Sequence, residues 1–262
     1  MTLAASSVMA YASTAGEKLP RALQAAITSG GFKIEKSFKA EGNLTGWVVS
    51  QGPGKNLVVY TPEKGDVFII GNMITSEGKN LTKEYLDTHA PKPEYDKLWG
   101  LLEKSSWVAT GTLKNPKSIV YVFKDFNCGY CHLAWKALEP YESKGLQVRW
   151  VPVAFLAESS VTKAAFVMQA KNKQQAFDEI QKAWGNRNAQ FPVSPSTATV
   201  EAIQKNGELM NEWGFRGTPA TLYKNSKGEV EAKGGMFRLS EIPGMTGLPF
   251  IDNKDPQLQE FR

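Results

Sequence analysis

The chain has 262 residues, of which 42% are apolar and 22% charged, and its 31 Lys and Arg against 26 Asp and Glu give a formal charge of +5. This composition excludes a globally disordered chain, and the sequence holds no apolar run of about 18 residues that would predict a transmembrane helix. The basic surplus is spread along the chain without a clustered stripe, so we expect a solvated surface and no nucleic-acid partner.

The N-terminal segment, residues 1–16, carries no charge, and Ala10, Tyr11 and Ala12 fit the small-x-small pattern of a cleavage site. This pattern is typical of the later part of a secretory signal peptide, although no basic residue precedes Lys18. We therefore expect a signal-peptide remnant or a mobile terminus. An exported chain would work in an oxidising compartment, where disulfides persist.

Residues 17–76 predict a small domain of one helix and an antiparallel sheet. Apolar spacing favours a helix over residues 18–29, which ends at Gly30 and Gly31. A domain of about 60 residues has a marginal core of its own, and a second copy would cover its sheet edge, so we expect a homodimer. The expected strands cover residues 32–38, 44–50, 57–61 and 66–72.

Residues 77–106 predict a linker that contains a helix. Residues 78–93 are rich in connector residues and end on Pro91 and Pro93. In the following stretch, residues 94–106, apolar side chains recur with helical spacing, so we expect a linker helix. These side chains are Tyr95, Leu98, Trp99 and Leu102.

The second domain, residues 107–262, predicts a β-α-β unit. Residues 118–123 form a continuous apolar, β-branched run, typical of a strand buried on both faces. A helix follows Cys128, and residues 147–153 form the next strand. Residues 158–213 have mainly helical spacing, and a turn at Gly217 leads into a further strand and a hairpin.

The only two cysteines of the sequence, Cys128 and Cys131, lie at the predicted start of that helix. Free backbone N–H groups and the helix dipole stabilise a thiolate at this position, so we expect Cys128 to be the attacking nucleophile. Cys131 lies one turn along the helix, where it can attack Cys128 and resolve a mixed disulfide. The dipeptide Gly129-Tyr130 between them would tune the stability of the thiolate.

Three other interpretations of the C-x-x-C motif compete with redox chemistry. The pair could be half of a zinc site, which needs two more ligands such as His89 and His132, a haem attachment motif ending at His132, or an inert buried pair. The strand-motif-helix context favours redox chemistry. We therefore expect no metal and no cofactor beyond a redox-active Cys128–Cys131 disulfide.

A second motif, Gly217-Thr218-Pro219, places a proline at the start of a predicted strand. Such a proline is a candidate for a cis peptide bond, and an ordinary trans bond is the alternative.

Together these segments resemble the bacterial periplasmic disulfide isomerases DsbC and DsbG. The resemblance rests on residues 120–123, Asp125, the run from Cys128 to Cys131 and residues 217–220. It extends over roughly residues 17–250, and the stretch from Asn80 to Trp107 is most similar to DsbG.

The resemblance implies a fold of the α+β or α/β class: a thioredoxin fold with a helical insertion at about residues 155–212, preceded by a cystatin-like dimerisation domain and a linker helix. It implies that Cys128 attacks, that Cys131 resolves, and that Pro219 is the cis-proline. Gly129, Tyr130, Thr218 and Pro219 would bind substrate, with the backbone beside Pro219 pairing with a substrate strand. The family's partners are unfolded or wrongly disulfide-bonded exported proteins and a membrane-bound DsbD-type reductase, in the periplasm.

Two departures from the family pattern leave the preferred reaction open. Gly129-Tyr130 and Gly217-Thr218 look like DsbC, whereas their flanks look like DsbG. The buried acid of cytosolic thioredoxins is replaced by Val122, which leaves proton transfer without an assigned group. The expected activity is disulfide isomerisation or reduction with chaperone-like binding. The alternatives are reduction of sulfenylated cysteines and a holdase chaperone; a DsbA-like monomeric oxidase would lack the first domain.

Overall fold

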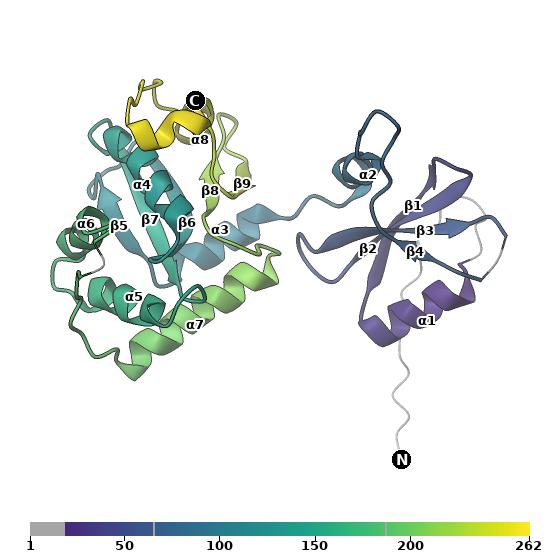
Figure 1. The fold of residues 1–262 in the computed structure, drawn as a ribbon, viewed down its shortest axis with the longest axis horizontal. Helices are drawn as coiled ribbons and strands as arrows, with labels where there is room; N and C mark the ends of the chain where they lie inside the picture. The colour runs from purple at the N-terminus through teal and green to yellow at the C-terminus, as the bar shows by residue number, and fades with distance from the viewer. Residues whose placement is uncertain (1–18, 65, 187) are drawn as a thin grey trace, which may run out of the picture. The chain divides into compact units, whose positions relative to one another are not determined.

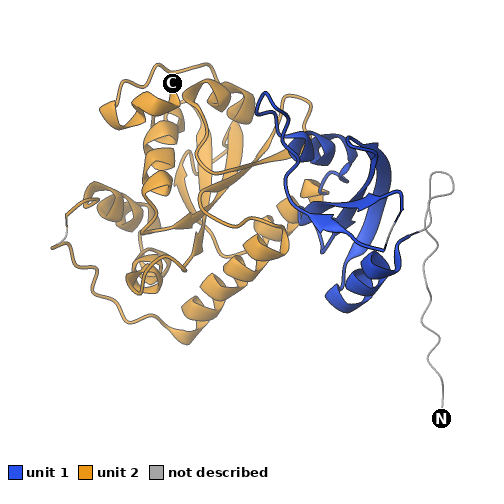
Figure 2. Cartoon of the chain, turned by 45° about the vertical axis from the view of Figure 1, so that its right-hand side comes forward, with its two compact units in different colours: residues 1–93 blue, residues 94–262 orange. Residues whose placement is uncertain are grey.

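The computed structural model describes residues 19–64, 66–186 and 188–262. The signal segment predicted for residues 1–16 lies outside the described residues. The chain divides into two compact units, residues 1–93 and 94–262 (Figure 2). This division differs from the boundaries expected at 76 and 106, because the predicted linker helix packs inside the second unit.

The first unit is built on a four-stranded antiparallel sheet in the order β1-β2-β3-β4 (Figure 1). Its first helix and its first three strands fall close to the expected positions. The elements are α1 (Arg21–Gly30), β1 (Lys33–Ala40), β2 (Leu44–Ser50), β3 (Asn56–Pro62), β4 (Ile69–Ile70) and α2 (Leu81–His89).

Apolar side chains cover both faces of this sheet. Leu23 of α1 packs with Trp47 and Val59 on one face. On the other face Tyr60 packs near Tyr85 of α2, and the Tyr60 hydroxyl bonds the Thr82 hydroxyl at 2.5 Å. The prediction of a plain connector at residues 78–93 was therefore wrong, because the second face needs a covering helix.

The last strand of this sheet is shorter than predicted. A strand was expected over residues 66–72, but only Ile69 and Ile70 pair with β3, opposite Tyr60 and Val59. Ile70 is 66% exposed, and Val67, Ile69 and Ile74 are also more than half exposed. We call these four side chains the β4 patch.

The second unit contains a five-stranded sheet in the order β5-β7-β6-β8-β9, in which only β6 and β7 are parallel (Figure 1). Three helices lie between β7 and β8 in sequence, where helical spacing was predicted. The elements are α3 (Tyr95–Glu103), β5 (Val108–Gly111), β6 (Ser118–Asp125), α4 (Gly129–Glu142), β7 (Leu146–Val153), α5 (Ser159–Gln169), α6 (Lys173–Lys182), α7 (Thr197–Glu212), β8 (Ala220–Lys224), β9 (Val230–Gly234), α8 (Ile242–Thr246) and two 3-10 turns (Leu239–Glu241 and Pro256–Phe261).

The central strand β6 is buried on both faces, as its continuous apolar run predicted. Val120 and Val122 belong to the core beneath α4, α6 and α8. Tyr121 and Phe123 alternate onto the opposite face, where they meet α3 and the end of α7. Helix α3 thus contributes to the core of the second unit, which explains why it belongs to that unit and not to a separate linker.

Within the part of the chain that the structure describes, no helix is both long enough and apolar enough to cross a membrane.

Candidate active site

The two cysteines sit where strand β6 passes into helix α4. Cys128 is the N-cap of α4, and its Sγ accepts a hydrogen bond from the Cys131 backbone N–H at 3.3 Å. An N-cap position of this kind satisfies one of the free N–H groups of the first turn. Both cysteines are free thiols, and Cys131 is fully buried one turn into the helix.

The two thiols have opposite acidities. The pKa of Cys128 is lowered to about 6, chiefly by its hydrogen bond with Cys131, with further help from the Thr218 side chain and from the charge of Lys124. Burial raises the pKa of Cys131 well above its ordinary value, and its hydrogen bond with Cys128 raises it further. At neutral pH Cys128 is therefore a thiolate while Cys131 keeps its proton.

The loop that carries Thr218 and Pro219 lies against Cys128. The Thr218–Pro219 peptide bond is cis, as the family resemblance implied. The Cys128 thiol, when protonated, donates to the Thr218 carbonyl at 3.2 Å. Residues that are 90 positions apart in sequence thus meet at one sulfur atom.

The dipeptide between the cysteines forms the outer surface of the first turn. A side chain on Gly129 would meet only Trp184, at 3.8 Å, so this position is open. Tyr130 is 57% exposed and lies edge-to-face with Phe261 at 6.3 Å between ring centroids. The predicted substrate-binding residues therefore gather around Cys128.

Asp125 organises the loop that precedes Cys128. Its buried carboxylate accepts four hydrogen bonds, two at each oxygen: from the Asn127 N–H and the Ser160 hydroxyl at 2.8 Å, and from the Phe155 and Leu156 N–H groups at 2.9 and 3.1 Å. These bonds connect the end of β6 to the segment after β7 and to α5. The carboxylate thereby holds the chain that delivers Cys128 to the helix.

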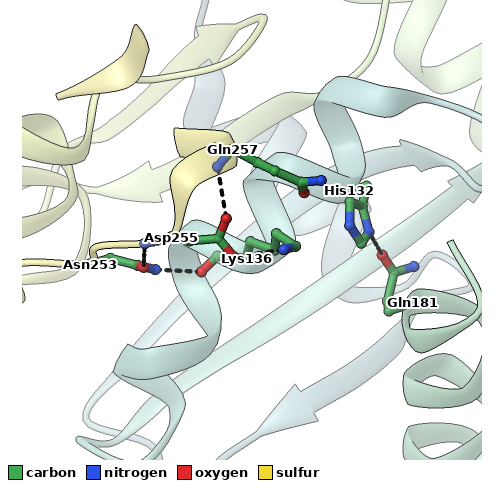
Figure 3. A network of polar contacts seen from close by, with 6 residues as sticks. All are labelled: His132, Lys136, Gln181, Asn253, Asp255 and Gln257. Carbon is green, nitrogen blue, oxygen red and sulfur yellow. Dashed lines mark hydrogen bonds and ion pairs between the residues drawn. The ribbon is translucent and has the colours of Figure 1, made fainter. Parts of the chain in front are cut away.

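His132 lies beneath the site. Its ring is buried, stacks on Trp184 with 4.8 Å between centroids, and forms a 3.0 Å hydrogen bond from Nδ1 to Gln181 of α6 (Figure 3). Burial lowers the pKa of His132, so its ring is neutral at pH 7. These contacts make His132 part of the packing between α4 and α6.

The C-terminal segment is fastened to the outer side of α4. Lys136 forms an ion pair with Asp255 at 2.6 Å, and the Asn253 side chain donates to the Lys136 carbonyl at 2.8 Å (Figure 3). Asp255 also accepts from the Gln257 N–H at 2.9 Å. This segment supports the helix and brings Phe261 to Tyr130.

Lys124, beside Asp125 at the end of β6, is a second charged residue that is fully buried. Its ammonium group donates to the Cys131 carbonyl at 3.2 Å. Among residues 19–64, 66–186 and 188–262, no three His, Cys, Asp or Glu side chains gather as a metal site would require.

The comparison with known families matches the thioredoxin-like domain to residues 109–241, about half of the chain. The chain belongs to the thioredoxin-like family. This match covers β6, both cysteines, the helical insertion and the cis-proline strand, and so it agrees with the fold predicted for the second domain.

Curated relatives of this thioredoxin-like chain carry the names DsbG and DsbC. DsbG of Pseudomonas aeruginosa is 29% identical over 89% of this chain and 91% of its own length, and DsbG of Escherichia coli is 27% identical over 84% and 88%. DsbC of Haemophilus influenzae is 33% identical over 45% of this chain and 48% of its own length. The resemblance to DsbG and DsbC that the sequence indicated is confirmed.

Sequence reasoning identified the cysteines and the proline motif but missed the buried charges. Asp125 is predicted only as part of the family pattern, and Lys124, which follows the strand expected at residues 118–123, has no predicted role. Both residues directly follow the apolar run at residues 118–123, and no turn residue separates them from it. The absence of a turn residue is the signal that could have predicted that the strand, and the burial, continue through them.

Proposed function

We propose that this protein catalyses thiol–disulfide interchange on protein substrates, with Cys128 as the attacking and Cys131 as the resolving residue. The observation that carries the proposal is the contrast between the two thiols. With a pKa of about 6, the Cys128 thiolate outnumbers its thiol about tenfold at pH 7, whereas Cys131 is buried and protonated. A disulfide interchange protein needs this pairing of an active nucleophile with a reserve thiol.

The reaction has two exchange steps. The Cys128 thiolate attacks one sulfur of a substrate disulfide, a mixed disulfide forms, and the other substrate sulfur leaves as a thiolate. In isomerisation, a substrate thiolate then attacks the mixed disulfide and frees Cys128. In reduction, the Cys131 thiolate attacks the Cys128 sulfur of the mixed disulfide and releases the substrate as a thiolate. The substrate disulfide is thereby reduced by two electrons, and the two cysteines are oxidised to the Cys128–Cys131 disulfide.

We propose an unfolded or misfolded protein segment as the substrate. An apolar groove of about 510 Å³ lies beside the loop that leads to Thr218, and Phe155, Val200 and Phe215 are among its lining residues. Phe155 is half exposed although its N–H is held by Asp125. Extended chain can pair with backbone next to Pro219 while its apolar side chains enter such a groove.

We propose that the first unit serves dimerisation through the β4 patch. Four exposed apolar side chains on and beside a two-residue edge strand are unusual for a monomeric surface. Pairing of this edge with the same edge of a second copy would cover the patch with a two-fold interface.

We propose the periplasm as the compartment and a membrane-bound thiol reductase of the DsbD type as the electron source. Disulfide substrates persist only where the environment is oxidising, and an isomerase there needs a partner that keeps its thiols reduced. The relatives named DsbG come from Pseudomonas aeruginosa and Escherichia coli.

The proposal is tested by refolding scrambled ribonuclease A with reduced protein in a glutathione buffer. We expect the wild type to restore ribonuclease activity, Cys128→Ala to be indistinguishable from buffer, and Cys131→Ala to accumulate mixed disulfides with the ribonuclease. Recovery that does not depend on Cys128 would contradict the proposal.

The same variants separate the alternatives. Absence of recovery by the wild type, together with Cys128-dependent reduction of a sulfenylated protein, would replace isomerisation by sulfenic-acid reduction. Suppression of aggregation by the double variant Cys128→Ala, Cys131→Ala, without any recovery by the wild type, would leave a holdase.

A further inference from the structure

The resolving step poses an electrostatic problem that the cysteines alone do not solve. Cys131 must lose its proton before it can attack Cys128, yet its side chain is fully buried and burial opposes the charged form. The position where cytosolic thioredoxins carry a buried acid holds Val122 in this chain. Some other group must reduce the cost of a thiolate in this interior.

Lys124 is the charged group that the fold places there. Residues Val120, Val122 and Lys124 alternate onto the same face of β6, the face that α4 covers. Lys124 has no solvent exposure, and its Nζ donates to the carbonyl of Cys131 at 3.2 Å. The ammonium therefore lies against the residue whose ionisation the reaction requires.

The surroundings of Lys124 favour a charge without neutralising it. Three aromatic rings enclose its side chain: Nζ lies 5.2 Å from the ring centroid of Trp150, 5.4 Å from Phe126 and 5.6 Å from Phe177. The bond to Cys131 is its one hydrogen bond to the described residues, although an ammonium can donate three. A buried lysine with so few partners costs folding free energy, which suggests that its charge serves the site.

The titratable groups of the described residues that interact with Lys124 lie on or beside the active site. Asp125 follows it on β6, both cysteines face it from α4, and His132 follows Cys131 on that helix. From β7 and α6, the rings of Trp150 and Phe177 face its ammonium group. Burial lowers the pKa of Lys124 to about 8, and interaction with Cys131 and Cys128 in their thiolate forms, and with Asp125, opposes that decrease.

We propose that Lys124 is the buried cation that stabilises the Cys131 thiolate and so enables the resolving step. The proposal rests on the interchange function above. In this step Cys131 releases its proton to solvent, its thiolate forms a bond to the Cys128 sulfur, and the bond from Cys128 to the substrate sulfur breaks. The substrate leaves as a thiolate and takes up a proton from solvent, so atoms and charges balance.

The charge acts unequally on the two cysteines. For Cys131, Lys124 is the largest of the influences that lower the pKa, whereas for Cys128 it is the smallest of several. Removal of the charge should therefore affect the second step more than the first. An opposite charge at close range shifts a pKa by about one to three units. A rise of about two units in the Cys131 pKa leaves about a hundredfold less Cys131 thiolate at a given pH. Because a more basic thiolate is also a better nucleophile, by about tenfold here, the net loss of rate is about tenfold.

The experiment is stopped-flow reaction of the reduced full chain with excess 5,5′-dithiobis(2-nitrobenzoate), followed through the released thionitrobenzoate. The first release reports attack by Cys128, and the second reports resolution by Cys131. For Lys124→Met we expect the first phase within about twofold of wild type and the second about tenfold slower, with its pH profile displaced to higher pH. Lys224→Met, which removes an exposed lysine over Trp99 in the same sheet, should change neither phase.

The outcomes distinguish this proposal from the function on which it rests. A wild type that shows no Cys128-dependent first phase would refute the interchange function. A normal first phase with equal second phases in wild type and Lys124→Met would refute the role of Lys124, and so would equal slowing of both phases. Replacement of an unpaired buried charge by an apolar side chain should preserve folding.

A measurement on the wild type covers the case in which Lys124→Met does not fold. In the disulfide form neither sulfur can carry a negative charge, so Lys124 loses the Cys128 thiolate and, at alkaline pH, the Cys131 thiolate that favour its ammonium. With lysine labelled at Cε, NMR titration should find one lysine with a pKa near 8 in the reduced chain and a lower pKa in the oxidised chain. The same pKa in both redox forms would overturn the proposal.

Discussion

The two units of the chain expose their apolar side chains in different ways. In the first unit these side chains gather at the β4 patch, on and beside an edge strand of only two residues. In the second unit β6 is buried on both faces, and among the exposed apolar side chains Tyr130 lies between the two cysteines and Phe155 lies beside the loop that precedes Cys128. An open edge offers backbone to another strand, whereas a surface around a nucleophile offers side-chain contacts to a substrate. The difference supports the proposal that the first unit serves assembly and that the second unit carries out the chemistry.

The largest expected effect comes from charging the edge of the first unit. We predict that the double substitution Ile69→Lys, Ile70→Lys converts a dimer into a monomer, with at least about a hundredfold loss of affinity, because two buried apolar contacts per copy are replaced by facing like charges. Sedimentation velocity over a concentration series measures the change.

The same variant sharpens the comparison through its chemistry. The rate at which Cys128 reacts with the chromogenic disulfide should stay at the wild-type value, and Leu101→Lys, at an exposed position of α3 in the second unit, should leave the dimer intact. A wild-type chain that sediments as a monomer, or a double variant that remains dimeric, would show that the β4 patch is not an assembly surface.

The next effect concerns the loop that presents Cys128. In Asp125→Asn one of the two oxygens becomes an NH₂ group, which faces donors in place of accepting their hydrogen bonds. We predict a loss of about 2–4 kcal/mol in the unfolding free energy of the second unit, since two bonds are lost inside the protein. Guanidinium denaturation measures it with Asp252→Asn, at an exposed carboxylate of the same unit, as the matched control. A change no larger than that of the control would mean that the loop holds without Asp125.

The sequence predicted the elements that depend on apolar pattern and missed those that depend on contacts. The run at residues 118–123 and the cysteine spacing were enough to predict β6, α4 and the position of Cys128. Helix α2 was missed because its sequence is largely polar, and it is stabilised by packing against the face of the sheet that α1 does not cover. No local sequence pattern predicts that this face of the sheet will be covered by a helix.

The buried charges were missed for a related reason. Asp125 and Lys124 are charged residues at the end of a strand, where a turn and an exposed side chain are the ordinary expectation. Their burial depends on partners from about 30 to 50 residues away, such as Phe155 for Asp125 and Phe177 for Lys124. The candidate site and its Cys128 thiolate could thus be predicted from the sequence, whereas the buried charges beside the cysteines could not.

The smallest expected effect concerns Glu142, a partly buried carboxylate of the second unit that has no part in the proposed reaction. It tests whether burial of such a charge lowers the unfolding free energy. Burial raises the pKa of Glu142 from 4.5 to about 7, although the Thr110 hydroxyl donates to its carboxylate. The folded state therefore holds a proton that the unfolded state releases above pH 4.5, so stability falls as the pH rises from about 4.5 to about 7. A shift of this size corresponds to about 3 kcal/mol, which partial exposure of Glu142 reduces to about 1–2 kcal/mol.

We predict that Glu142→Gln, which keeps the shape and stays neutral, removes this pH dependence. The variant should match wild type near pH 4.5 and exceed its unfolding free energy by about 1–2 kcal/mol at pH 8. Thermal denaturation of both proteins across this pH range measures the difference. Parallel pH profiles would show that Glu142 is ionised in the folded protein without cost. A gain in unfolding free energy at pH 8, with an unchanged reaction rate of Cys128, would show that the buried carboxylate of Glu142 lowers stability without serving the reaction. Lys124 would differ from it as a buried charge that the proposed resolving step needs.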